Sequence, residues 1–279
     1  MAIHPLPDIA TDVEDRLVRA ARGSDAFGKL IEPWRRPLFG YVYRMVTHPQ
    51  DAEDLTQEAI IRAFQFLAEF RAESRFKSWL FGIATHICLD HLRKKKRWRV
   101  EAQLEGEKRA EADPEALEQL GGLMSQPDFV FEIREHITFC FSCVARTLEP
   151  QEQAALMLRE VLGFTAREAA DILDVTDSVF RHRRSSARSQ MCTAFDGLCQ
   201  LINKTGVCYQ CTGLREHAPR QNQCESLPEI TVAPGLDLTP DNLLDARVRI
   251  ARKADLEDGG TRRLHEGFFS GLSAHEESR

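Results

Sequence analysis

The sequence lacks the features that would direct a chain into or across a membrane. No stretch of its 279 residues approaches the roughly 18–20 consecutive apolar side chains that a membrane-spanning helix needs. The first residues, MAIHPLPDIATDVED, contain no basic segment followed by an apolar core, so they do not predict a secretory signal. We therefore expect a soluble protein of the cytoplasm.

Motifs of enzymes are also missing. The sequence has no phosphate-binding loop, no His-x-x-x-His metal helix and no nucleophile elbow. Glycine and proline are sparse, at 16 and 12 residues, while 43% of the residues are hydrophobic and 29% are charged. The composition predicts a globular protein with room for one large domain or two ordinary ones, and the missing motifs predict that it is not an enzyme.

Helical periodicity runs through most of the chain. Strand-like alternation is absent apart from a few residues near 230–232, so the sequence predicts an all-α fold. Pro33 and Pro37 predict a break or kink in the helical stretch that ends near residue 46. The helix that starts at residue 51 carries the apolar stripe Leu55, Ala59, Ala63, Phe66 or Leu67, and Phe70.

Composition divides the chain into four segments. Residues 8–98 and 128–191 predict two helical domains. Between them, residues 99–127 are acidic and weakly periodic, which predicts a flexible linker. Residues 192–279 form a C-terminal extension with amphipathic helices expected at about 240–256 and near 261–272.

The charge of the chain is unevenly distributed. Its net charge is −6, yet residues 91–99 carry six lysines or arginines and residues 181–188 carry four arginines. Local basic patches of this kind bind DNA phosphates whatever the total charge is. Each run is equally compatible with the solvated end of a helix, so neither run decides the function alone.

The second basic run lies in a helix-turn-helix pattern. Thr165 and Glu168 form the sequence of a capping box that opens a short helix. After a turn at Asp174-Val175, Thr176 can cap a second helix that runs to about Met191 and carries the arginines. Two short helices with cations on the second are typical of DNA-binding domains, although many helical hairpins bind no DNA.

Three segments together resemble a known family, the extracytoplasmic-function sigma factors of bacterial RNA polymerase. DAEDLTQEAIIRAF at 51–64 is similar to the family helix that docks on the β′ clamp of core polymerase. FRAESRFKSWLFGIATHICLDHLRKKKR at 70–97 resembles the stretch that reads the −10 element and melts promoter DNA, and 148–188 resembles the −35-reading helix-turn-helix. The resemblance implies a sigma factor that brings core polymerase to promoters and opens the DNA.

The resemblance also implies roles for individual residues. Of the two aromatics that lie among the bases at residues 75–79, Trp79 fits the core better, while Phe76 fits a single-stranded base. Residues expected to bind polymerase are Asp51, Asp54, Gln57, Glu58 and Ile61. Residues expected at the −10 element are Arg75, Phe76, Lys77, His86, Asp90, His91, Arg93 and Lys94. Residues expected at the −35 element are Arg181, His182, Arg183, Ser185 and Arg188.

Arg184 departs from the expected pattern. It shares a helical face with Phe180, Ala187 and Met191, and that face should be buried. Relatives usually have an aliphatic side chain at this position. Either the head of Arg184 reaches solvent, or it pairs with a carboxylate.

The eight cysteines leave three interpretations open. Cys140, Cys143, Cys208 and Cys211 form two CxxC pairs, and four thiolates suit structural zinc. The same pairs could act as a redox switch or simply pack in the core. Apart from this zinc, the chain predicts no cofactor.

Two further functions compete with the sigma-factor interpretation. One is a helix-turn-helix regulator that binds duplex DNA without polymerase, and the other is a metal- or redox-sensing protein. The segments 51–64 and 70–97 favour the sigma factor, because an ordinary regulator does not need them. Some family members are regulated by a C-terminal extension or by an anti-sigma protein, so we expect either form of control here.

Overall fold

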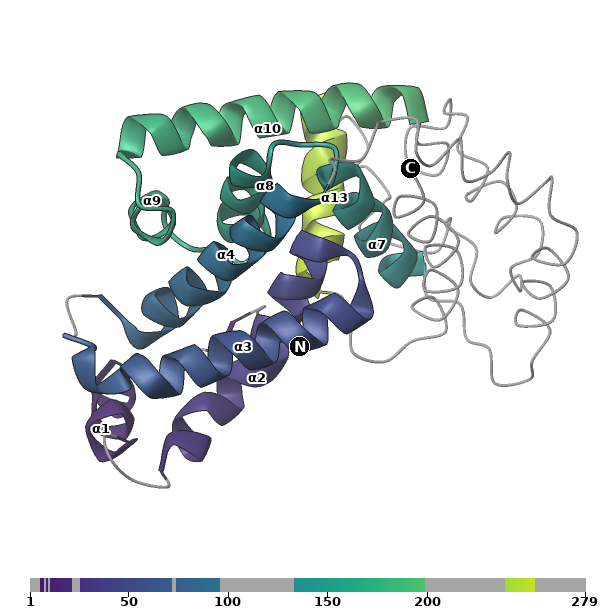
Figure 1. Cartoon of the computed structure of the whole chain (residues 1–279). Coiled ribbons are helices and arrows are strands. Elements are labelled where there is room, and N and C mark those ends of the chain that lie inside the picture. The colour runs from purple at the N-terminus through teal and green to yellow at the C-terminus, as the bar shows by residue number, and fades with distance from the viewer. Residues whose placement is uncertain are drawn as a thin grey trace, which may run out of the picture. The chain divides into compact units, whose positions relative to one another are not determined.

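The helical periodicity of the sequence is realised throughout the described chain. The computed structural model describes residues 6–7, 9, 11–21, 26–71, 74–95, 133–198 and 239–253, and these contain helices and turns but no strand (Figure 1). The all-α prediction is therefore confirmed. The expected linker at 99–127 lies outside the described residues.

Two compact units divide the chain differently from the predicted domains. The first unit joins Met1–Lys95 with Glu149–Ala187, and the second joins Lys96–Leu148 with Arg188–Arg279. The N-terminal helices and the helix-turn-helix, expected in separate domains, thus share one unit. Among the described residues, no helix is both long and apolar enough to cross a membrane.

Four helices form the N-terminal part of the first unit. Its core is made by large side chains that have no exposed surface, among them Trp34, Tyr41 and Phe81. The Tyr41 hydroxyl and the Thr85 hydroxyl lie 2.8 Å apart, so these two buried groups are hydrogen-bonded to each other. The helices are α1 (Thr11–Ala21), α2 (Phe27–Val46), α3 (Pro49–Phe66) and α4 (Phe76–Lys94).

The prolines of α2 do not interrupt it. Pro33 and Pro37 each lack an N–H group, yet the chain stays helical from Phe27 to Val46, so the predicted break is absent. Trp34 and Leu38, beside the two prolines, have no exposed surface. Burial of such side chains stabilises the helix more than two missing hydrogen bonds weaken it.

Helix α3 begins on a proline and buries small residues. His48 precedes Pro49, and its Nδ1 accepts a hydrogen bond of 3.2 Å from the Asp51 amide. The predicted stripe is confirmed at Ala59, Ala63, Leu67 and Phe70, and it extends back to Ala52 and Thr56. It is wrong at Phe66, which is 48% exposed, and Leu55 is half-buried. The 3-10 turn η1 (Leu67–Glu69) rotates Leu67 inward instead of Phe66.

The helix-turn-helix occupies the other part of the first unit. Thr165 accepts from the Glu168 amide at 3.2 Å and donates its own amide to the Glu168 carboxylate at 2.9 Å, which confirms the capping box. Asp174 makes the turn with a φ of 52°. The elements are α8 (Pro150–Leu156), the π-helical turn η2 (Met157–Val161), α9 (Ala166–Ile172) and the first half of α10 (Asp177–Leu198).

Specific contacts join the two parts of this unit. The Gln153 side-chain amide donates hydrogen bonds to the main-chain carbonyls of Arg44, at 3.1 Å, and Met45, at 3.0 Å. The Phe81 and Phe164 rings meet edge to face with centroids 5.4 Å apart. These contacts place α9 beside α4, the helix that carries most of the predicted −10 residues.

The second unit contains α7 (Ile133–Ala145), the end of α10 and α13 (Pro240–Lys253). Helix α13 packs against α7, and the Phe141 and Phe195 rings stack with centroids 6.4 Å apart. Helix α13 corresponds to the helix expected at about 240–256. The segments 230–232 and 261–272 lie outside the described residues.

Candidate nucleic-acid interface

The outer face of α3 presents acidic and apolar side chains together. Asp54, Gln57 and Ile61 are exposed, whereas Glu58 is half-buried and pairs with Arg62 one turn later. Phe64, which the sequence did not single out, is 58% exposed, and Phe66 lies further along the helix. We call Asp54, Gln57, Glu58, Ile61, Phe64 and Phe66 the docking face.

Asp51 does not belong to this face. Its Oδ2 accepts a hydrogen bond of 2.7 Å from Lys95 Nζ and lies 3.3 Å from His91 Nε2. Burial raises the pKa of this carboxyl, but the hydrogen bond and charge of Lys95 and the nearby His91 and His48 outweigh burial and hold the pKa below its usual value. Asp51 therefore ties the start of α3 to the end of α4.

Phe76 and Trp79 differ from expectation, because Phe76 is buried in the core and Trp79 is partly exposed. Phe76 is only 1% exposed, and its ring lies 6.1 Å from that of Phe70. Trp79 is half-exposed and rests on Phe70 at 5.0 Å. In this arrangement Phe76 is a core residue that cannot stack on a base, and Trp79 is the aromatic with an accessible surface.

Arg75 and Lys77, two of the residues expected at the −10 element, form ion pairs with carboxylates. Arg75 Nε lies 3.2 Å from the buried Glu14, and its Nη2 donates to the Ile9 carbonyl at 2.6 Å. Lys77 Nζ lies 3.4 Å from Glu168 and 5.2 Å from the centre of the Phe164 ring. Burial raises the pKa of the Glu168 carboxyl. The hydrogen bonds from Thr165 and the charge of Lys77 together lower this pKa by more than burial raises it, so the net shift is downward.

The later −10 residues follow the polar side of α4, as expected. His86, Asp90, Arg93 and Lys94 are exposed, and Asp90 pairs with Arg93 at 2.6 Å. His91 is half-buried by its contact with Asp51. The exposed members can reach a ligand without any change in the helix.

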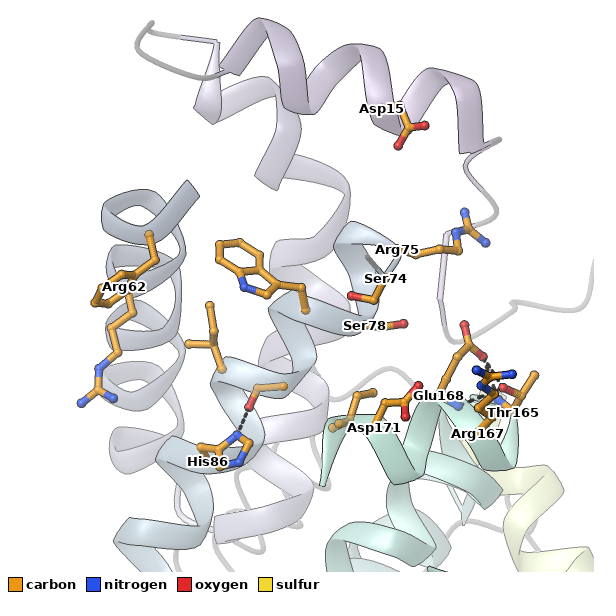
Figure 2. A pocket seen from close by; sticks show the side chains of 15 residues that line it. Asp15, Arg62, Ser74, Arg75, Ser78, His86, Thr165, Arg167, Glu168 and Asp171 are labelled. Carbon is orange, nitrogen blue, oxygen red and sulfur yellow. Dashed lines mark hydrogen bonds between the residues drawn. The ribbon is translucent and has the colours of Figure 1, made fainter. Parts of the chain in front are cut away.

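A cavity of about 900 Å³ lies between α4 and α9 (Figure 2). Arg75, just before α4, and Ser78 and His86 of α4 line one side, and Glu168 and Asp171 of α9 line the other. Further lining residues include Trp79, Arg62 and Arg167. Cations around an accessible indole suit a nucleic-acid base and its phosphate, while the α9 carboxylates compete for the same cations.

The predicted −35 residues lie on α10 with unequal exposure. Arg181, His182 and Ser185 are exposed, and Arg181 pairs with Asp177 one turn earlier. Arg183 is half-buried. Arg188, in the second unit, contacts two carboxylates of α13 and keeps 17% of its side chain exposed. The structure thus brings Arg181, His182 and Ser185 to one accessible helix surface.

Arg184 follows the second of its two expected arrangements. Its Nε donates a 2.6 Å hydrogen bond to Oε1 of Glu160, whose side chain is 10% exposed. Phe180, Ala187 and Met191 have no exposed surface, as expected for this face. With the Arg184 head group paired to Glu160, the buried face of α10 is the one that the sequence predicts. Arg181 and Ser185 therefore face outward.

The cysteines within the described residues are buried or half-buried. Cys140 is 8% exposed and Cys143 is 3% exposed, and both lie on α7, three residues apart and so on one side of the helix. Cys208 and Cys211, the other half of the expected zinc site, lie outside the described residues. Within the described ranges, no group of three or more potential ligands could hold a metal ion.

Two family models match the chain in the same order as these surfaces. The model of sigma-70 region 2 matches residues 30–98, and that of sigma-70 region 4 matches residues 139–191. The first match contains the docking face and α4, and the second contains the helix-turn-helix. Members of this family are transcription initiation factors and not enzymes.

Several curated proteins are similar to the chain. The ECF RNA polymerase sigma factor SigG of Mycobacterium tuberculosis is 32% identical over 177 residues, which cover 60% of this chain and 48% of SigG. The RNA polymerase sigma-H factor of Pseudomonas aeruginosa is 26% identical over 68% of this chain and 97% of that protein. The chain thus spans about half the length of SigG and nearly all of sigma-H.

A solved structure is similar at lower identity. The sigma factor RpoE of Bartonella quintana, in complex with the anti-sigma factor NepR, is 17% identical, covers 62% of this chain and 98% of RpoE, and has a TM-score of 0.43. In its two matched regions, residues 30–98 and 139–191, the chain is thus similar to extracytoplasmic-function RNA polymerase sigma factors.

Proposed function

We propose that this protein is a sigma factor that directs core RNA polymerase to specific promoters and opens the DNA there. The observation that carries the proposal is the presence, in one chain, of an exposed acidic and apolar face on α3 and a helix-turn-helix with exposed cations on α10. A regulator that works without polymerase has no use for the first surface.

The docking face is proposed to bind the β′ clamp of core polymerase. Exposed apolar side chains such as Ile61 and Phe64, at 47% and 58%, are costly in water unless a partner covers them. Asp54 and Glu58 beside them would select a partner helix that carries cations. An amphipathic face of this kind suits a helical partner.

The start of α4 is proposed to hold the melted strand at the −10 element. Trp79 offers an accessible ring for an unstacked base, and Arg75 and Lys77 lie within two turns of it to neutralise phosphates. Glu14 and Glu168 now pair with these cations, so DNA would have to replace both carboxylates. The exposed His86, Asp90, Arg93 and Lys94 extend this surface along the helix, and His91 borders it.

Helix α10 is proposed to read the −35 element. Arg181 can make two hydrogen bonds to a guanine edge in the major groove, while His182 and Ser185 lie beside it. Arg183 and Arg188 are proposed to contact phosphate and fix the register. Cys140, Cys143, Cys208 and Cys211 are proposed as structural zinc ligands, and metal analysis of the purified full chain tests that part separately.

Binding to core polymerase is the experiment that separates this function from that of an independent regulator. Wild-type chain should co-elute with core polymerase, and the Asp54→Lys, Glu58→Lys double variant should bind much more weakly while it keeps its helical circular dichroism spectrum. The Glu32→Lys, Asp196→Lys variant makes the same charge change at exposed positions on α2 and α10, outside the docking face, and should bind as the wild type does. Equal polymerase binding by the two double variants would count against the proposed face.

A further inference from the structure

Helix α13 lies beyond both family matches, the second of which ends at residue 191. It is nevertheless built into the core of the second unit. Leu244, Ile250 and Ala251 have no exposed surface, and the helix packs against α7 (Figure 1). The C-terminal extension thus contributes a structural helix to the unit that contains the end of α10.

One face of α13 binds a cation of the proposed DNA surface. Arg188 Nη2 donates hydrogen bonds to Asp245 Oδ1 at 2.9 Å and to Asp241 Oδ1 at 3.2 Å. Asp241 and Asp245 are four residues apart, so they lie on one face of the helix and both reach the same guanidinium. Two carboxylate oxygens thus occupy Nη2, a donor that would otherwise be available to a phosphate oxygen.

Further contacts hold α13 against α10. The Arg247 guanidinium lies 4.0 Å from the centre of the Phe195 ring, and Arg247 is 1% exposed. Cys192 donates from Sγ to Asp241 Oδ1 at 3.8 Å, and burial together with the charge of Asp241 raises the pKa of its thiol to about 11. The thiol therefore stays protonated at neutral pH and keeps this donor.

From these contacts we propose that α13 is an internal competitor of DNA for Arg188. The proposal rests on the proposed function of α10. For Arg188 Nη2 to contact a DNA phosphate, the carboxylates of Asp241 and Asp245 must release it. The helix thereby lowers the affinity of the free chain for duplex DNA.

The test measures binding of the full chain to a 25-base-pair duplex of mixed sequence by fluorescence anisotropy over a range of salt concentrations. A phosphate contact does not depend on sequence, so the promoter need not be known. We expect the Asp241→Asn, Asp245→Asn variant to bind on the order of tenfold more tightly at low salt than the wild type. Its slope of log affinity against log salt should steepen by about 0.9, the change for one added phosphate contact.

Two controls make the result specific. In the variant background, Arg188→Ala should abolish both the gain in affinity and the steeper slope. The Glu32→Gln, Glu69→Gln variant removes the same charge from exposed positions outside α13 and should gain far less affinity. Asp245→Asn alone should give part of the gain, and it serves as the test if the double variant does not fold.

An unchanged affinity, or a gain that persists without Arg188, would overturn the proposal. The proposed function is judged by different results, which are polymerase binding and promoter-specific initiation by the wild type. A wild-type protein that initiates at specific sites, combined with aspartate variants that gain no affinity, would remove the internal competitor and leave the sigma-factor function intact.

Discussion

Gln153 and Met45, 108 residues apart in the chain, are joined by a buried hydrogen bond of 3.0 Å. The donor is the side-chain amide of Gln153 on α8, which also binds the Arg44 carbonyl at the end of α2. The last carbonyls of a helix have no partner within the helix, so an external donor satisfies them. This contact connects the helix-turn-helix part of the first unit to the N-terminal helices.

Gln153→Ala should lower the free energy of unfolding by about 1–3 kcal/mol, because it leaves the two buried carbonyls without this donor. Denaturant unfolding followed by circular dichroism measures the change. Gln151→Ala, on the same helix at a half-buried position, is the matched control and should have a much smaller effect. Equal effects of the two substitutions would show that the hydrogen bonds of Gln153 contribute little.

The Arg184–Glu160 ion pair makes a prediction about stability. Arg184→Ala should destabilise the chain by about 1–3 kcal/mol, since Glu160 keeps a poorly exposed charge without this partner. The Arg184→Met, Glu160→Gln variant removes both charges and should be closer to the wild type. Urea unfolding of four proteins gives the coupling energy: the wild type, Arg184→Met, Glu160→Gln and the variant with both substitutions. A coupling energy near zero would contradict the role assigned to the pair.

Glu168 predicts a specific pH dependence. Its folded-state pKa lies below the ordinary value of 4.5, so the ionised carboxylate stabilises the fold above about pH 4.5. This contribution is lost as the pH falls through the lowered pKa. Glu168→Gln can still cap α9 but cannot titrate. Its free energy of unfolding should therefore change less with pH below 4.5 than that of the wild type.

Unfolding series at several pH values check this expectation, with Glu69→Gln at an exposed position as the matched substitution. The same slope in the Glu168→Gln variant and the wild type would rule out a folded-state stabilisation by the Glu168 charge.

Substitutions of the two aromatics at the start of α4 should have different effects on stability and on promoter opening. Phe76→Ala should cost about 3–5 kcal/mol of unfolding free energy, because it empties a buried site. Trp79→Ala should cost less, since Trp79 is half-exposed, but should reduce promoter opening. Permanganate reactivity of thymines near the start site measures opening in the polymerase complex. Undiminished reactivity with Trp79→Ala would remove its proposed contact with DNA.

Local signals predicted much of this fold. The helical period identified an all-α chain, and the capping box at Thr165 and Glu168 located the start of α9. Both depend on residues close in sequence, whose preferences act whatever the rest of the chain does. The register of α10 was predictable in the same way, because Phe180, Ala187 and Met191 repeat at helical spacing.

Contacts between distant residues were not predictable. Phe76 and Trp79 are both aromatic, and only their packing on Phe70 decides which one is buried. Asp51 fits the acidic start of α3, yet Lys95, 44 residues away, turns it into a structural contact. Arg188 is likewise bound by carboxylates 53 and 57 residues further along the chain. Periodicity within one helix contains no information about such partners.

The most direct test of the sigma-factor function is transcription from supercoiled DNA with purified core polymerase. Start sites are mapped with and without the full chain, and with the Asp54→Lys, Glu58→Lys variant in its place. We expect discrete starts that require the wild-type chain and are strongly reduced with the variant. Absence of any start site that depends on the chain would contradict the sigma-factor function.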